Sequence, residues 1–179
     1  FAALTPTEKR ISIARDVIAQ LDAGNISPRT GTYVENYDLD ELVKDARLVC
    51  KTDVQLQSLL KKTNGEECTV CAVGSLFVSG VRVANAIKVS DLEDPDIGLQ
   101  GADAFNYLKK FFSREQLALI EIAFETDSTH RLLGQDWDRI NEAVSFGELF
   151  EDDGDDREET ESTRLRAIME NIVANKGKF

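Results

Sequence analysis

The sequence predicts an all-α protein in which residues 1–179 form a single helical domain. Apolar residues recur at spacings of three and four along several segments, which is the period of a helix with one buried face. Two helix starts are marked by reciprocal capping pairs, and no two alternating segments are joined by a hairpin turn. A length of 179 residues with 42% hydrophobic residues is sufficient for one sizeable core.

The first predicted helix begins at a capping box. Thr5 suits the cap, Pro6 suits the first helical position, and Glu8 can bond back to Thr5. Gly24 is expected to end the helix, because glycine readily adopts the left-handed conformation that follows a last turn. Residues 25–36 contain a proline, a glycine and several hydroxyls, and we expect an extended loop there. The apolar face of the helix consists of Ile11, Ala14, Val17, Ile18 and Leu21.

Residues 68–86 are predicted to form the central buried helix of a helical bundle. Their sequence, CTVCAVGSLFVSGVRVANA, has a single charge at Arg82 and is apolar or small on every side. A helix without a polar face must be buried all round. The β-branched residues and two glycines also permit a strand, which remains open as an alternative. Before this segment, the helical period predicts a helix over 38–50 and a short one over 56–60.

Three further helices are predicted in the second half of the chain, followed by a last one near its end; the first of them has an apolar face formed by Ala104, Phe105, Leu108 and Phe111. A second capping box, formed by Ser113 and Gln116, starts one of them. A shorter helix begins at Trp137. The last helix has a single apolar stripe that consists of Leu165, Ile168, Met169, Ile172 and Val173.

An acidic run lies before the last helix, and we expect a mobile, solvated loop at about 151–161. It holds eight acidic residues and one arginine, and therefore most of the formal net charge of −12. A calcium loop of the EF-hand type does not fit, because placing Gly154 sixth puts Leu149 first. The run would attract a basic surface on a protein partner. The residues assigned to partner binding are Asp152, Asp153, Asp155, Asp156, Glu158 and Glu159.

The overall charge excludes some classes of partner. With 33 acidic and 21 basic residues, direct binding to nucleic acid or to an anionic membrane face is not expected. No apolar run reaches the roughly 18–20 residues of a membrane span, and no signal peptide is visible, so we expect a cytoplasmic protein. The sequence begins at Phe1 rather than Met, and whether the chain is a fragment of a longer protein is left open.

The cysteines raise three chemical hypotheses. Cys68 and Cys71 form a C-x-x-C pair that could support redox chemistry, although Glu66 and Glu67 before it would raise a thiol pKa. Cys50 and His130 could complete a zinc site with the pair. Alternatively, Cys68 or Cys71 could act as a nucleophile with His130 as its base. Two small buried helix residues are the plainer interpretation of the pair, so we assign no catalytic residue, metal or cofactor.

Two stretches, CTVCAVGSLFVSGVRVAN (68–85) and RLRAIMENIVANKGKF (164–179), resemble short bacteriophage and bacterial proteins of unassigned function. The segments ISIARDVIAQL and SPRTGTYV near the N-terminus are similar to them in the same way. The resemblance implies a phage or prophage setting and carries over no functional residue. We therefore expect a non-enzymatic module that binds, and modulates or inhibits, a host protein. A thiol- or zinc-dependent protein and a structural homo-oligomer remain the alternatives, and the oligomeric state is left open.

Overall fold

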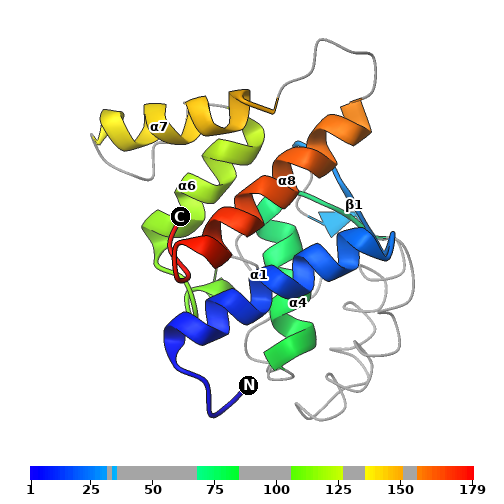
Figure 1. Cartoon of the computed structure of the whole chain (residues 1–179), viewed down its shortest axis with the longest axis vertical. Helices are drawn as coiled ribbons and strands as arrows, with labels where there is room; N and C mark the ends of the chain where they lie inside the picture. Colours follow the sequence, from blue (N-terminus) through cyan, green and yellow to red (C-terminus); the bar gives the residue numbers. More distant parts are fainter. Residues whose placement is uncertain (32–33, 36–67, 85–105, 127–135, 151–156) are drawn as a thin grey trace, which may run out of the picture.

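A computed structural model of the chain describes residues 1–31, 34–35, 68–84, 106–126, 136–150 and 157–179 (Figure 1). The predicted helices over 38–50 and 56–60 lie outside these residues. The mainly helical class is confirmed. The helices are α1 (Pro6–Asp22), α4 (Ala72–Ala84), α6 (Arg114–Glu125), α7 (Trp137–Glu148) and α8 (Arg157–Ala174), and the strands are β1 (Ile26–Pro28), β2 (Val34–Glu35) and β3 (Cys68–Val70).

Both predicted capping boxes are present. The Thr5 hydroxyl accepts a hydrogen bond from the backbone N–H of Glu8 at 3.3 Å, and the Glu8 carboxylate accepts from the Thr5 N–H at 2.8 Å. Ser113 and Gln116 make the same reciprocal pair at 3.1 and 3.2 Å before α6. Gly24 follows α1 with φ of +69°, as its predicted role requires. These starts could be predicted because each depends on residues only three positions apart.

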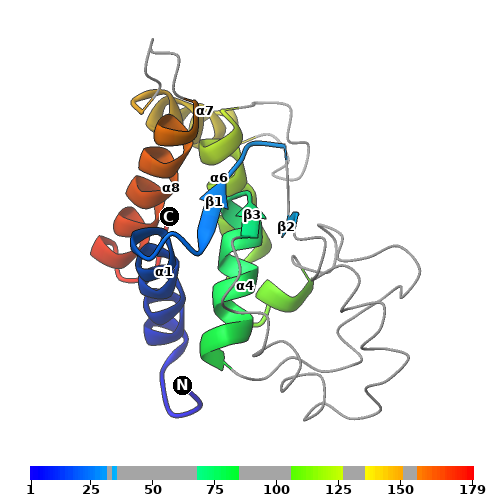
Figure 2. The same cartoon turned by 90° about the vertical axis from the view of Figure 1, so that its right-hand side faces the viewer.

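A small three-stranded sheet corrects two of the predictions. β3 pairs in parallel with β1 and antiparallel with β2, in the order β1-β3-β2, and Figure 2 shows the strands next to one another beside α4. Residues 26–28 and 34–35 are therefore strands and not loop, and residues 68–70 are a strand and not helix. The β-branched pair Thr69 and Val70 suits a strand that is hydrogen-bonded on both sides.

The predicted central helix is confirmed over Ala72–Ala84, as α4, although its last turn, residues 81–84, is not buried as predicted. Most of its residues are buried, and Leu76 and Phe77 belong to the core. Gly80 allows a close approach by Tyr107, because a Cβ at Gly80 would lie 3.2 Å from the tyrosine ring. The Tyr107 hydroxyl in turn donates to the Gly80 carbonyl at 3.1 Å. The one predicted charge of this helix, Arg82, pairs with Asp16 of α1 at 2.8 Å.

The helices enclose a single core. α1 and α8 lie side by side with α4 behind them, and α7 packs on α6 at one end of the molecule (Figure 1). The predicted apolar stripe of α8 faces this core, with its residues fully buried except for the half-buried Val173. The largest of the fully buried side chains among the described residues are Ile13, Leu76, Tyr107, Leu108, Leu117, Ile120, Ile122, Phe124, Ile140 and Leu165.

The loop predicted at about 151–161 ends earlier than expected. Helix α8 begins at Arg157, so residues 157–161 are helical. Glu158 and Glu159 lie in its first turn, where the exposed backbone N–H groups and the helix dipole favour carboxylates. The same charges that suggested a solvated loop therefore also stabilise a helix start.

Candidate functional site

Cys71 caps α4 and is buried. Its Sγ accepts a hydrogen bond from the Gly74 N–H at 3.4 Å, and its carbonyl accepts from the Ser75 N–H at 2.8 Å. Burial raises the pKa of the Cys71 thiol to about 12; the Gly74 hydrogen bond offsets a part of this, and the carboxylates of Glu121 and Glu125 add to it. The thiolate is the nucleophile and the metal ligand, so a thiol with this pKa is inert at neutral pH.

The other residues of the cysteine hypotheses are not brought together. The backbone of Cys68 belongs to β3, but its side chain lies outside the described residues, as do Cys50 and His130. The thiol and zinc hypotheses therefore stay predictions for these three. Among the residues that the structure describes, no three His, Cys, Asp or Glu side chains are grouped so that they could hold a metal ion.

Two carboxylates from different helices hold the loop that follows β1. Glu161 of α8 accepts hydrogen bonds from the Thr30 N–H at 3.0 Å and from the Thr30 hydroxyl at 2.7 Å. Glu125 of α6 accepts from the Gly31 N–H at 2.8 Å. Glu161 is only 4% exposed, so the end of the acidic run points into the protein. Glu161 thus has a structural role that its place in a charge run concealed.

The residues assigned to partner binding fall into two groups. Asp152, Asp153, Asp155 and Asp156 lie outside the described residues. Glu158 and Glu159 are exposed in the first turn of α8, and the Glu158 carboxylate accepts from the Ser27 hydroxyl at 3.1 Å. A role of these residues in binding remains a prediction.

A buried arginine joins the ends of α6 and α7 to α8. Arg164 donates from Nε to the Gly147 carbonyl at 3.2 Å and from Nη1 to the Phe124 carbonyl at 2.9 Å. Gly147 lets α7 touch the backbone of α6, because an added Cβ would overlap the carbonyl oxygen of Ala123. It would also lie 2.9 Å from Cγ2 of Thr126. These contacts fix α7 against α6 and so set its distance from α8.

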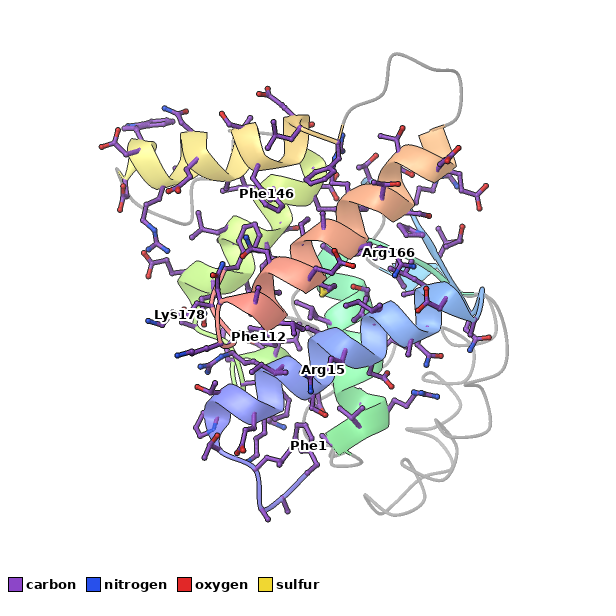
Figure 3. The ribbon with its side chains drawn as sticks, in the orientation of Figure 1. Phe1, Arg15, Phe112, Phe146, Arg166 and Lys178 are labelled. Atoms are coloured by element: carbon purple, nitrogen blue, oxygen red, sulfur yellow. The ribbon has the colours of Figure 1, made fainter. Side chains whose placement is uncertain are left out.

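A hollow of about 180 Å³ opens between α7 and α8, over α6. We call it the α7–α8 groove. In Figure 3, Phe146 points from α7 toward α8. The groove contains the buried side chains of Leu119 from α6 and Ala143 from α7. The residues that line it are Leu119, Arg139, Glu142, Ala143, Phe146, Asn171, Asn175 and Phe179.

Three half-buried phenylalanines form a row, of which Phe146 and Phe179 line the groove and Phe150 packs on Phe146 outside the lining. The ring centroid of Phe146 is 5.4 Å from that of Phe179, edge to face, and 5.4 Å from that of Phe150. Leu149, which is 76% exposed, lies three residues after Phe146 and therefore on the same side of α7. Trp137 is 57% exposed, but about two and a half turns separate it from Phe146 and place it on the opposite side.

Polar groups surround the apolar row. Arg139 forms an ion pair with Glu115 of α6. Glu142 is exposed and makes no ion pair with any residue that the structure describes. Across the groove, the Asn175 amide nitrogen donates to the Asn171 side-chain oxygen at 2.9 Å.

The last residues of the chain fold back onto α1 and α6. The Gly177 carbonyl accepts from Arg10 Nε at 2.7 Å and from Gln116 Nε2 at 3.2 Å, and Gly177 has a φ of +78°. This turn holds Phe179 against Phe146. A second hollow, of about 410 Å³, is shallow because the terminal turn alone forms it; it is lined by Ala174, Asn175, Lys176, Lys178 and Phe179.

The dimensions of the groove indicate what it can hold. Pockets for metabolites and cofactors usually measure about 300–1,000 Å³, so a hollow of about 180 Å³ suits a single large side chain better. Sequence reasoning missed this site because its residues come from three helices and the terminal turn. The sequence offered a signal only next to the site, in the apolar pair Leu149 and Phe150 directly before the acidic run, and neither residue lines the hollow.

None of the described helices combines the length and the apolar character that crossing a membrane requires. Comparison with protein-family models, with curated proteins and with solved structures found no match to this chain.

Proposed function

We propose that the chain is a non-enzymatic protein-binding module, and that a partner docks at the α7–α8 groove. The observation that carries the proposal is the pair of half-buried rings that line the groove, Phe146 and Phe179, with Phe150 packed on Phe146 and the exposed Leu149 next to Phe150 in the sequence. Contiguous apolar surface with a polar rim is characteristic of protein interaction sites. The protonated state of the buried Cys71 thiol argues against the nucleophilic alternative at that residue.

The acidic run supports a partner with a basic surface. Asp152, Asp153, Asp155 and Asp156 follow Phe150 directly in the sequence. A field of this sign would speed association with a basic protein in a salt-dependent way. By the resemblance to small phage proteins, we propose that the partner is a host protein that the chain modulates or inhibits.

The proposal is tested by capture from a bacterial lysate at low and at high salt, with two matched variants. Leu149→Ser and Trp137→Ser each remove an exposed apolar side chain at an end of α7, one directly after the helix on the side of Phe146 and one on the opposite side. We expect a salt-sensitive partner that is lost with Leu149→Ser and kept with Trp137→Ser. Equal capture by both variants, or no salt-sensitive partner at all, would contradict the proposal.

A structural homo-oligomer is tested on the same samples. Light scattering during size exclusion gives the mass of the wild type and of Leu149→Ser. A wild-type oligomer that Leu149→Ser dissociates would assign the groove to self-association and contradict a host partner there.

A further inference from the structure

We infer that the α7–α8 groove binds an extended segment of the partner, which inserts one aromatic side chain and places a Lys or Arg beside Glu142. The inference rests on the proposed function, and it adds the chemistry of the ligand. Three features of the groove carry it: the size of the hollow, the side-chain amides at the end of α8 and the charge on α7.

The hollow has the size and lining for one aromatic ring. An apolar cavity of about 150 Å³ is known to hold benzene, so about 180 Å³ is enough for a phenyl group. Leu119 and Ala143 supply apolar contact, and the rings of Phe146 and Phe179 offer edges and faces for a third aromatic ring. A charged or small side chain would leave this surface in contact with water.

Asn171 in α8 and Asn175 directly after it have side-chain amides that can bond to an extended main chain. Their one mutual hydrogen bond uses the nitrogen of Asn175 and the oxygen of Asn171. The Asn171 nitrogen and the Asn175 oxygen make no further hydrogen bond with the described residues. A donor and an acceptor at the same rim match the C=O and N–H groups of an extended peptide. A helical ligand would offer neither, because its backbone groups are bonded internally.

The charge on the α7 rim favours a basic residue next to the aromatic one. Arg139 is paired with Glu115, whereas the carboxylate of Glu142 has no ion pair among the described residues. Lys176 and Lys178 line the second hollow, which adjoins the groove at Asn175 and Phe179. The preference for a basic residue should therefore be confined to the side where α7 lies.

Short peptides test the inference on the whole chain, observed through the backbone amide signals of Ala143, Phe146 and Asn175 by NMR. The probes are acetylated, amidated hexapeptides: Gly-Ser-Phe-Arg-Ser-Gly, the same peptide with Glu for Arg, and the same peptide with Ala for Phe. We expect the Phe-Arg peptide to shift the three signals. Replacing Phe should weaken binding at least about tenfold, as loss of a buried phenyl does. Replacing Arg by Glu should weaken it about two- to fivefold, as loss of one exposed ion pair does.

A pair of variants locates the charge preference. Glu142→Gln should reduce the preference for Arg over Glu, whereas Glu148→Gln, an exposed carboxylate outside the groove lining, should leave it unchanged. Equal binding of the Phe and Ala peptides, or shifts away from the groove, would overturn the inference. If no peptide binds while lysate capture still depends on Leu149, the inference fails and the proposed function stands. If the peptides bind but no partner is captured, the groove has the inferred ligand chemistry, and the proposed binding of a host protein is contradicted.

Discussion

Gly147→Ala provides a sharp test of how α7 is held on α6. In an exposed helix this change stabilises by up to about 1 kcal/mol, because alanine is the better helix former. Here the added Cβ overlaps the backbone oxygen of Ala123 and lies 3.0 Å from its carbonyl carbon. Backbone atoms cannot move aside as a side chain can, so α7 must shift away from α6. We therefore expect Gly147→Ala to lower the free energy of unfolding by about 1–3 kcal/mol, which is the usual effect of overpacking.

The assay is equilibrium unfolding in urea, followed by circular dichroism and by the fluorescence of Trp137, the only tryptophan. For a chain of this length the expected loss corresponds to a Tm lower by roughly 2–12 °C. Ser145→Ala, an exposed change on the same helix, serves as the control and should change stability by no more than about 0.5 kcal/mol. A Gly147→Ala variant as stable as the wild type would refute the close contact and, with it, the position of α7 that forms the groove.

Three further predictions concern buried and capping groups. Burial raises the pKa of Cys71 to about 12, so the folded state keeps a proton that the unfolded thiol releases. The free energy of unfolding should therefore fall as pH rises from about 9 toward 12, by up to about 1.4 kcal/mol per pH unit. Urea unfolding at several pH values should show this fall in the wild type and not in Cys71→Ala. Parallel pH profiles of the free energy of unfolding in the two proteins would contradict the prediction. Glu161→Gln should lower the free energy of unfolding by about 1–3 kcal/mol, because its hydrogen bonds to Thr30 become weaker, whereas Glu158→Gln should lower it by less than about 0.5 kcal/mol. Equal losses in the two variants would count against the buried role of Glu161. The hydrogen bonds that the backbone N–H and the hydroxyl of Thr5 donate to the Glu8 carboxylate lower the pKa of Glu8, so their contribution to folding stability is lost as the pH falls through that pKa. An NMR titration should find a higher pKa of Glu8 in Thr5→Ala. An unchanged pKa would show that the hydroxyl plays no part.

The contrast between local and distant interactions explains what the sequence could predict. Thr5 with Glu8 and Ser113 with Gln116 are pairs within one turn, and their patterns identified two helix starts correctly. The strand Cys68–Val70 depends on pairing with Ile26–Pro28, which no local pattern contains. A short apolar segment can be helix or strand until its partner is known.

The candidate site was harder to predict for the same reason. Glu161 was grouped with its solvated neighbours, because nothing in a charge run distinguishes the carboxylate that meets Thr30. The α7–α8 groove depends on the angle between helices, which Gly147 and Arg164 set through backbone contacts. A sequence shows that Phe146 and Phe179 are apolar, but only the fold brings them together.

The pairing of α1 with α8 places the first and last helices of the chain side by side (Figure 1). The buried side chains of α1, such as Ile13 and Val17, therefore remain incompletely covered until α8 has been synthesised. The parallel pairing of β1 with β3 likewise joins segments far apart in sequence. Closing such long loops slows folding relative to helical proteins with local contacts. A growing chain should thus leave the apolar face of α1 exposed until α8 has emerged from the ribosome, and chaperones would bind it best before that point.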